Sequence, residues 1–454
     1  MTKENDATRR KYLKAIGTAG LMGLAGCAGD GEGTPTPKVR TVVRTVEGEE
    51  RTVVKTKVVE KTASGSSQPI HFGSILPITG DLSDFGPGMQ EGVNFAVREI
   101  NNAGGLLDGR SVAIHNRDSE TVAQKAQQKY NALANEQNII GFVGAASSGV
   151  SVPLSQSVAG DQIFQCSPAS TSPTLAELGY NDDESVKYFG RTAPNDGQQG
   201  IVMGRILNED DYVGADKAAF LHVNNAYGQG LAEKAQQAFD GETLRLVPYS
   251  SQTTDYTSTL DKLFQGDPDA VGFVGYPESG QSILQTWSDG GYGDQWILSE
   301  GLNSPDFFNA IPDIVEGMYV SSPQPVESPG ASKFNQMFQQ RVGHAPRVFS
   351  PHSYDAMYMM ALAVEQAGEA SGTAIAENIR NISSPEGESV TVGEFDKAKE
   401  LVSAGEAINY EGASSNVDLN EKLEPLNRFA ILQVSGGSTE TLETIPAEFF
   451  EGKL

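Results

Sequence analysis

Cysteine is scarce in this chain of 454 residues, which contains only Cys27 and Cys166. A single pair cannot form a disulfide framework, and the two are not spaced as metal ligands. No internal run of apolar residues approaches the roughly 18 that a membrane-spanning helix needs. We therefore expect no metal site, and we expect the body of the protein to be soluble.

Positive charge is also in short supply, with 33 Lys and Arg against 59 Asp and Glu. A nucleic-acid-binding protein needs a clustered basic surface, and none follows the N-terminal region, so we expect no nucleic-acid partner. The carboxylates are scattered along the chain, which favours a solvated acidic surface over a cationic partner. Such a surface suits strong salt, where screening weakens self-repulsion, and it indicates a halophilic host. Low stability after removal of salt would be its signature.

Nucleotide-binding motifs are missing as well. No glycine fingerprint opens a helix directly after a strand, no phosphate-binding loop carries a lysine, and Gly141–Gly144 has the wrong spacing. An enzyme with a nucleotide cofactor is therefore unsupported, although an α/β fold by itself would leave binding protein and enzyme open.

The N-terminus contains an export signal. Residues 8–14 (TRRKYLK) read as a twin-arginine (Tat) signal, and the apolar segment Ala15–Leu24 leads to Leu24–Cys27 (LAGC), which resembles a lipobox. A chance cysteine is disfavoured because these features occur in the right order. We predict that residues 1–27 are a lipoprotein signal peptide with lipid attached to Cys27. The exported protein would then be lipid-anchored on the outer face of the cell membrane.

A low-complexity segment follows the signal. Residues 28–68 are rich in Gly, Thr and Pro and then become charged, and Arg40–Val43 (RTVV) recurs at 51–54. The segment has no large apolar residues to bury, so a flexible or extended tether is predicted. The alternating valines leave a small hairpin as the alternative.

From Pro69 onward, strand-like runs alternate with helical patterns. Ile70–Pro77 is strand-like, Gly88–Asn101 has apolar residues at helical spacing, and the alternation starts again after Arg191–Pro194. The other expected strands are 111–116, 139–143, 162–165, 218–223, 243–249, 270–274 and 296–299, and later helices are expected from Gly230, Tyr256 and Gly280. This order predicts an α/β protein with two doubly wound lobes and a ligand cleft between them.

Several short segments occur in the order found in one family of binding proteins. They are Leu76–Gly80 (LPITG), Phe85-Gly86, Gly92–Asn101, Gly144–Ser148, Ser167–Thr171, Asn225–Gly228 (NAYG), Gly275-Tyr276 and Ser299–Gly301. Any one of them is weak, but together they are specific. From about Ile70 to the C-terminus the chain resembles the type I periplasmic binding proteins, in particular the leucine/isoleucine/valine-binding branch.

The resemblance implies two Rossmann-like lobes joined by a three-strand hinge. The N-terminal lobe would comprise 69–192 plus 322–412, and the C-terminal lobe 193–321 plus 413–454. The chain would cross between the lobes near 191–194, 321–323 and 413–416. Closure around a ligand in the interlobe cleft would then be hinge bending.

The resemblance also places ligand contacts on the first lobe. Ser147 and Ser148 open a helix whose free N–H groups suit an amino-acid carboxylate, with the Ser148 hydroxyl as an added donor. The hydroxyl of Thr171 would hold the ligand together with the carbonyl of Ala169. From the residues alone, Ser148 and Thr171 can equally be helix caps, and for Thr171 the two roles are compatible.

Further contacts would come from both lobes. Glu300 would receive the ligand's ammonium group, because a carboxylate facing a cleft is costly to desolvate unless a cation arrives. Tyr227 and Tyr276 would form walls from the second lobe. Phe85 stands where the family often has Tyr or Trp, and it packs on an aliphatic side chain but cannot hydrogen-bond a polar one. Tyr354 can either close the far side of the pocket or pack in the core.

The implied function is that of the extracellular solute-binding component of an ABC importer. It would capture a free α-amino acid, most simply a branched-chain or other apolar one, and deliver it to a membrane permease. No enzyme activity and no cofactor are expected. The alternatives are a binding protein of the same fold for amides, urea or small aromatic acids, and the ectodomain partner of a sensor.

Overall fold

The computed structural model describes residues 68–293 and 295–453. The predicted signal, Cys27 and the predicted tether up to residue 67 therefore lie outside the described residues. Two large sheets and a small one organise the described part.

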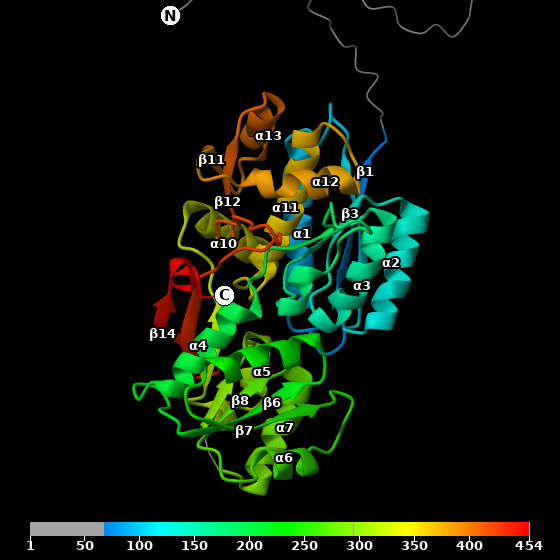
Figure 1. The fold of residues 1–454 in the computed structure, drawn as a ribbon. Helices are drawn as coiled ribbons and strands as arrows, with labels where there is room; N and C mark the ends of the chain where they lie inside the picture. Colours follow the sequence, from blue (N-terminus) through cyan, green and yellow to red (C-terminus); the bar gives the residue numbers. More distant parts are fainter. Residues whose placement is uncertain (1–67, 294, 454) are drawn as a thin grey trace, which may run out of the picture. The chain divides into compact units, whose positions relative to one another are not determined.

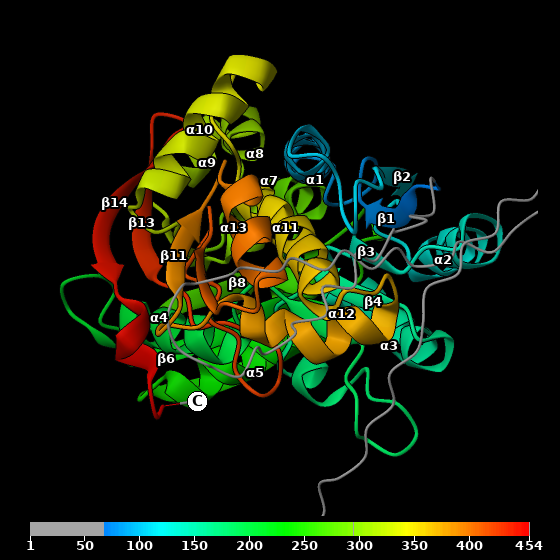
Figure 2. The same ribbon diagram turned by 90° about the horizontal axis from the view of Figure 1, so that it is seen from above.

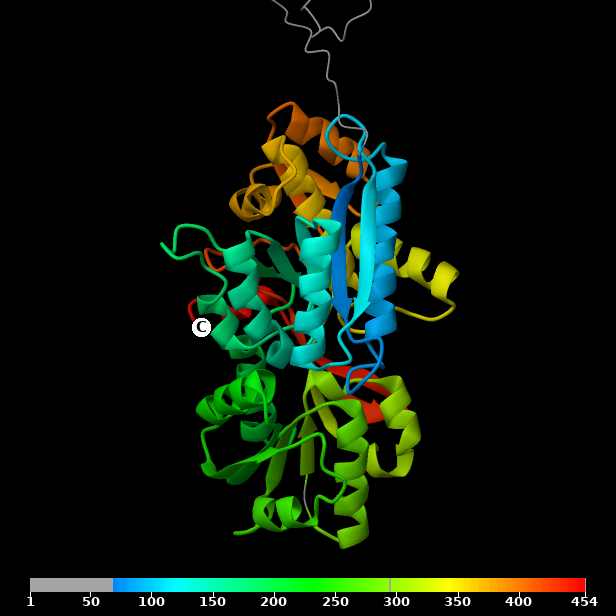
Figure 3. The same cartoon turned by 90° about the vertical axis from the view of Figure 1, so that its right-hand side faces the viewer.

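The first sheet has five parallel strands in the order β2-β1-β3-β4-β5. These are β1 Ile70–Leu76, β2 Val112–Asp118, β3 Gly141–Gly144, β4 Phe164–Ser167 and β5 Phe189–Arg191. Figure 3 shows β1 and β2 as two long strands between the helices α1 (Gly86–Asn102) and α2 (Ala123–Gln137). Because helices cover both faces, β3, β4 and β5 are fully buried.

Helices that come much later in the chain complete this lobe. Helix α11 (Ser350–Ala367) crosses α1 so closely that a Cβ on Gly92 would lie 2.4 Å from the Ser350 carbonyl oxygen. Phe95 of α1 packs edge-on against Phe334 and at a tilt against Phe338 of α10 (Pro329–Val342). Segments more than 200 residues apart in sequence thus share one core.

The second sheet has seven strands in the order β14-β13-β10-β9-β8-β6-β7. They are β6 Lys217–Val223, β7 Glu242–Tyr249, β8 Ala270–Val274, β9 Gln295–Leu298, β10 Tyr319–Pro323, β13 Phe429–Ser435 and β14 Ser438–Ile445. The first five of these are parallel, whereas β13 and β14 pair antiparallel at one edge. Helix α4 (Asp196–Asn208) packs closely on α5 (Ala226–Ala238) through Gly200 and Gly204. Figure 1 shows the two helices next to each other.

The remaining elements are short or peripheral. They are α3 Ser148–Asp161, α6 Thr257–Leu263, α7 Pro277–Gly290, α8 Pro305–Ala310, α9 Pro312–Val315, α12 Gly372–Asn378, α13 Phe395–Ser403, β11 Glu388–Thr391 and β12 Ile408–Glu411, with single turns of 3₁₀ helix at 173–177, 300–302, 379–382 and 447–450. Strands β11 and β12 form a separate parallel pair, and Figure 2 shows α13 beside α11. None of the helices in the described ranges is long and apolar enough to cross a membrane.

Three connections run between the two large sheets. Residues 192–195 join β5 to α4, residues 324–328 join β10 to α10, and residues 413–428 lead from β12 to β13. In the third, the N–H groups of Ala413 and Ser414 still donate to Asp355 of α11, both at 2.8 Å. The lobe boundaries derived from the resemblance remain a prediction.

The predicted α/β fold class is confirmed, and most expected strands lie within two residues of the observed ones. Two predicted helix starts are wrong. Helix α5 begins before Gly230 because the Asn225 side chain accepts hydrogen bonds from Tyr227 N and Gly228 N and so caps the helix. Helix α7 begins before Gly280 with Pro277, which needs no hydrogen-bond acceptor in the first turn.

Candidate functional site

Residues predicted to contact a ligand line one cavity between the two lobes. Seven of the eight predicted residues are in its lining: Phe85, Ser147, Ser148, Ala169, Tyr227, Tyr276 and Glu300. The exception, Thr171, lies directly behind the lining, where its backbone N–H donates to Ser148 Oγ at 3.1 Å. Larger hollows of about 590 and 480 Å³ lie against the connecting segments, and the second is lined by the buried Glu424, but the smaller cavity is the one that gathers the predicted ligand contacts.

The topology explains why these residues meet. Ser148 follows β3, Ala169 follows β4, Tyr276 follows β8, and Glu300 follows β9. Parallel strands bring their carboxyl ends to one edge of a sheet, so each lobe offers a row of loops at that edge. The two rows meet where Ser147 Oγ and Tyr276 Oη lie 2.9 Å apart.

The start of helix α3 forms part of the cavity lining. The first helical residues, Ser148 and Gly149, cannot donate their N–H groups within the helix, and the helix dipole is positive there. The Ser148 hydroxyl does not cap this helix; its oxygen accepts hydrogen bonds from Thr171 N and Ser172 N, both at 3.1 Å. The capping interpretation of Ser148 is therefore wrong, and the residue ties two loops of the first lobe together.

The second lobe contributes Glu300 to the same lining. Its Oε2 accepts hydrogen bonds from Tyr227 Oη at 2.9 Å and from Gln199 Nε2 at 2.6 Å. Burial raises the pKa of Glu300 to about 7, although these hydrogen bonds favour the charged form. Tyr227 stacks on Tyr276 with ring centroids 5.6 Å apart, and both phenols stay neutral because burial raises their pKa values.

A second buried carboxylate, which the sequence analysis missed, lies beside Glu300. Asp196 is the first residue of α4 and is fully buried, and neither carboxylate oxygen makes a hydrogen bond of ordinary geometry, although the Thr171 hydroxyl and Arg191 are near enough to favour its charged form. Burial and the nearby charge of Glu300 raise its pKa well above the usual value. Its backbone N–H donates to the Thr171 carbonyl at 2.9 Å. An acidic residue directly after an Asn cap was the available signal in the sequence.

Thr171 presents its hydroxyl to the same region. Its Oγ1 is buried without a partner, and so is the hydroxyl of Ser172. The 3₁₀ helix that starts at Pro173 has no side-chain cap, so capping by Thr171 is wrong as well. Uncompensated polar atoms are costly in a protein interior, and their concentration here indicates a site for a polar group.

The rest of the lining is apolar. Leu82, Phe85, Met89 and Phe349 are all at least nine-tenths buried and offer no hydrogen-bonding side-chain atoms. Phe349 has a left-handed backbone (φ 69°), which is unusual for a bulky residue and often marks a functional position. Tyr354 is absent from the lining and donates to Glu99, so it packs in the core.

Comparisons with known proteins show which family the chain belongs to. The sequence profile of the family described as periplasmic binding protein matches residues 69–403. The chain is 32% identical over 387 residues to the chemotactic signal transduction system substrate-binding protein BasB of Halobacterium salinarum, covering 85% of this chain and 92% of BasB. It is 28% identical over 298 residues to the Leu/Ile/Val-binding protein homolog 1 of Brucella suis, covering 64% and 77% of the two chains.

Solved structures show the same fold. The leucine-binding protein LivK of Thermotoga maritima matches with a TM-score of 0.71 and 21% identity, over 84% of this chain and 99% of LivK. LivJ of Streptococcus pneumoniae, solved in complex with isoleucine, matches with a TM-score of 0.69 and 20% identity, over 84% and 100%. The chain therefore belongs to the periplasmic binding protein family, and it has the fold of the LivK and LivJ structures.

Proposed function

We propose that this protein captures a free α-amino acid with an apolar side chain between its two lobes. The observation that carries the proposal is a cavity whose lining combines two kinds of polar group with an apolar surface. A helix start and a buried carboxylate, Glu300, lie at its polar margins, and apolar side chains fill the rest of the lining. A ligand without a cationic group would leave Glu300 buried and unpaired, which disfavours amides, urea and aromatic acids.

In this proposal, each part of the ligand contacts a different set of residues. The N–H groups of Ser148 and Gly149 bind the carboxylate, with the helix dipole adding attraction. The ammonium lies among Glu300, the Thr171 hydroxyl and the Ala169 carbonyl. Tyr227 and Tyr276 form one wall, and Phe85 and its apolar neighbours receive the side chain.

Two destinations for the loaded protein are supported by the relatives. The Leu/Ile/Val-binding relative favours delivery to the permease of an ABC importer. BasB, whose name assigns it to chemotactic signal transduction, favours a sensor partner as the second candidate. Stimulation of the permease's ATP hydrolysis by the loaded protein would support import, and ligand-dependent binding to a transducer ectodomain would support sensing. The predicted Tat signal and the predicted lipid on Cys27 lie outside the described residues. The mass of the mature N-terminal peptide tests cleavage before Cys27 and the attachment of lipid to it.

The first test of the function is a thermal unfolding screen in strong salt. Leucine, isoleucine and valine should raise the melting temperature, because a ligand that binds only the folded state adds about 2.7 kcal/mol of stability at a hundred times its Kd. The remaining amino acids, urea, acetamide and benzoate complete the panel. A shift with benzoate or the amides alone would overturn the assignment of Glu300.

Ligand affinity should depend on pH near neutrality. Glu300 must be charged to bind an ammonium group, and its pKa in the ligand-free protein is about 7. The Kd for leucine should therefore rise by about tenfold for each pH unit below that value. Isothermal titration calorimetry between about pH 5.5 and about pH 8 measures this change in Kd, and a Kd that does not vary with pH would contradict it.

The same raised pKa also affects stability. The ligand-free fold is most stable with Glu300 protonated and loses that stability as the pH rises through about 7.

A further inference from the structure

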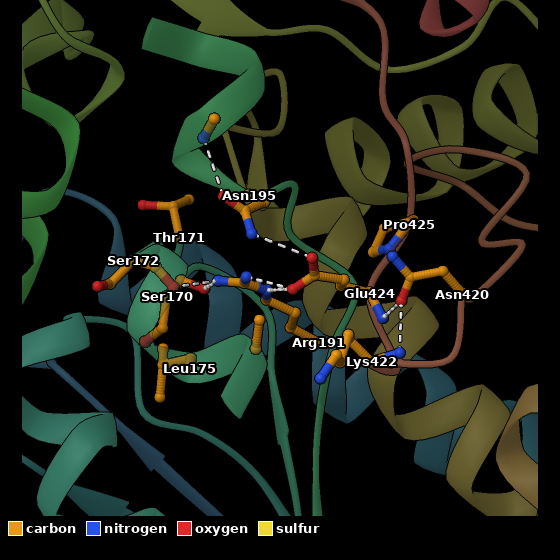
Figure 4. Close-up of polar contacts among 12 residues, drawn as sticks. Ser170, Thr171, Ser172, Leu175, Arg191, Asn195, Asn420, Lys422, Glu424 and Pro425 are labelled. Atoms are coloured by element: carbon orange, nitrogen blue, oxygen red, sulfur yellow. Dashed lines mark hydrogen bonds and ion pairs between the residues drawn. The ribbon is translucent and has the colours of Figure 1, made fainter. Parts of the chain in front are cut away.

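A buried ion pair joins the end of strand β5 to the connection that leads to β13. Arg191 is the last residue of β5, and Glu424 lies in the connection that leads to β13. Their side chains are only 1% and 9% exposed. Arg191 Nε donates to Glu424 Oε2 at 3.0 Å, and Nη2 donates to the same oxygen (Figure 4).

The arginine also holds the loop that carries Thr171. Its Nη1 donates to the carbonyl oxygens of Ser170 at 3.0 Å and Ser172 at 2.9 Å, which flank Thr171 on both sides (Figure 4). The planar guanidinium can serve these acceptors and Glu424 together because its donors point in fixed directions.

Glu424 also contacts the start of α4, which carries Asp196. Its Oε1 accepts from Asn195 Nδ2 at 3.0 Å, and Asn195 Oδ1 in turn caps α4 by accepting from Gly197 N at 2.9 Å. Asp196 stands between these two residues. One oxygen of the Glu424 carboxylate is therefore linked through Arg191 to the loop of Thr171. The other is linked through Asn195 to the helix start that carries Asp196.

The surroundings keep Glu424 charged and its segment in place. Burial opposes its charge, but Arg191 and Asn195 outweigh this and hold its pKa below the usual value. Arg191 N also donates to the Leu423 carbonyl at 3.0 Å. Nearby, Lys187 Nζ donates to the carbonyls of Leu175, Ala176 and Lys422. A buried ion pair is weak evidence for stability by itself, so a role in specifying geometry is the better explanation.

We propose that Arg191 and Glu424 are positioning residues that hold Thr171 and Asp196 in the geometry that receives the ligand's ammonium group. The pair thereby links ligand recognition to two of the connections about which the lobes would move. This inference rests on the proposed function.

Glu424→Gln tests the inference, because it removes the charge and keeps the shape. The Kd for leucine should rise by about tenfold, as expected for a lost charge-assisted hydrogen bond. Glu327→Gln is the matched control: Glu327 faces Arg428 across two connections at 3.6 Å, but its side chain is 90% exposed, so its Kd should change by less than about twofold. An unchanged Kd in Glu424→Gln would overturn the inference.

A double-mutant cycle separates positioning from a general structural role. In an Asp196→Asn background, Glu424→Gln should cost less than about threefold in Kd, because part of what it positions is already lost. Additive losses would contradict positioning. If Glu424→Gln does not fold, Asn195→Gly serves instead, since glycine is tolerated as a cap but breaks the link to Glu424; it should raise the Kd by about threefold, and no change would count against the proposal.

Hydrogen exchange distinguishes failure of this inference from failure of the proposed function. In the ligand-free protein, Glu424→Gln should speed amide exchange in residues 170–172 and 196–199, and Glu327→Gln should not. If no amino acid binds the wild-type protein, the proposed function fails, and this measurement alone decides the positioning role. Unchanged exchange in both segments would overturn it.

Discussion

Replacing Glu300 by glutamine should weaken leucine binding by about a hundredfold, or about 2.8 kcal/mol. Only 2% of the surface of Glu300 is exposed, so water screens its attraction to an ammonium group poorly. Glutamine preserves the shape and can still accept from Tyr227, but it presents no charge to the ligand. Isothermal titration calorimetry at about pH 8, where the wild-type carboxylate is ionised, measures the loss.

Glu365→Gln is the matched control for this substitution. Glu365 is also buried, and its Oε1 accepts from Leu107 N at 2.7 Å, but it lies in α11 and outside the cavity lining. This variant should lose some stability and keep its affinity within about twofold. If Glu300→Gln binds leucine as the wild type does, the ammonium does not bind at Glu300.

Asp196→Asn should make the ligand-free protein more stable and the ligand complex weaker. A fully buried carboxylate without hydrogen bonds of ordinary geometry, next to Glu300, is unfavourable when charged, so its removal should add about 1 kcal/mol of stability. The same carboxylate would attract the ligand's ammonium, so the Kd for leucine should rise by about tenfold or more.

Urea unfolding with and without leucine measures both effects on one sample. A stability gain together with an affinity loss is the pattern of a residue retained for binding at a cost in stability. Lower stability with unchanged affinity would instead make Asp196 a structural residue of the α4 start.

Local patterns in the sequence predicted eight of the 14 strands that the structure describes, and β5 and β10 to β14 were not among them. Parallel strands buried on both faces appear as short apolar runs, such as Ala270–Val274, and helices carry apolar residues at a period of 3.6. The segments around Ser148, Tyr276 and Glu300 follow strands directly, so their place at the carboxyl ends follows from chain order once the sheets are parallel. This is why most of the predicted ligand contacts line one cavity.

Contacts between distant segments could not be predicted from local sequence patterns. Asp196 follows a helix cap and looks like an ordinary first-turn residue until folding buries it beside Glu300, 104 positions later in the chain. Arg191 and Glu424 are separated by 233 residues, and nothing local marks either one as the other's partner.

Ser148 and Thr171 show the same limit at shorter range. Both fit the pattern of helix caps, yet the fold uses the Ser148 hydroxyl to join two loops and leaves the Thr171 hydroxyl without a partner. Periodicity and chain order depend on neighbours a few residues away, and these are written in the sequence. The burial of a charge and the choice of a hydrogen-bond partner depend on what packs around a group, and that is settled only when the two lobes have formed.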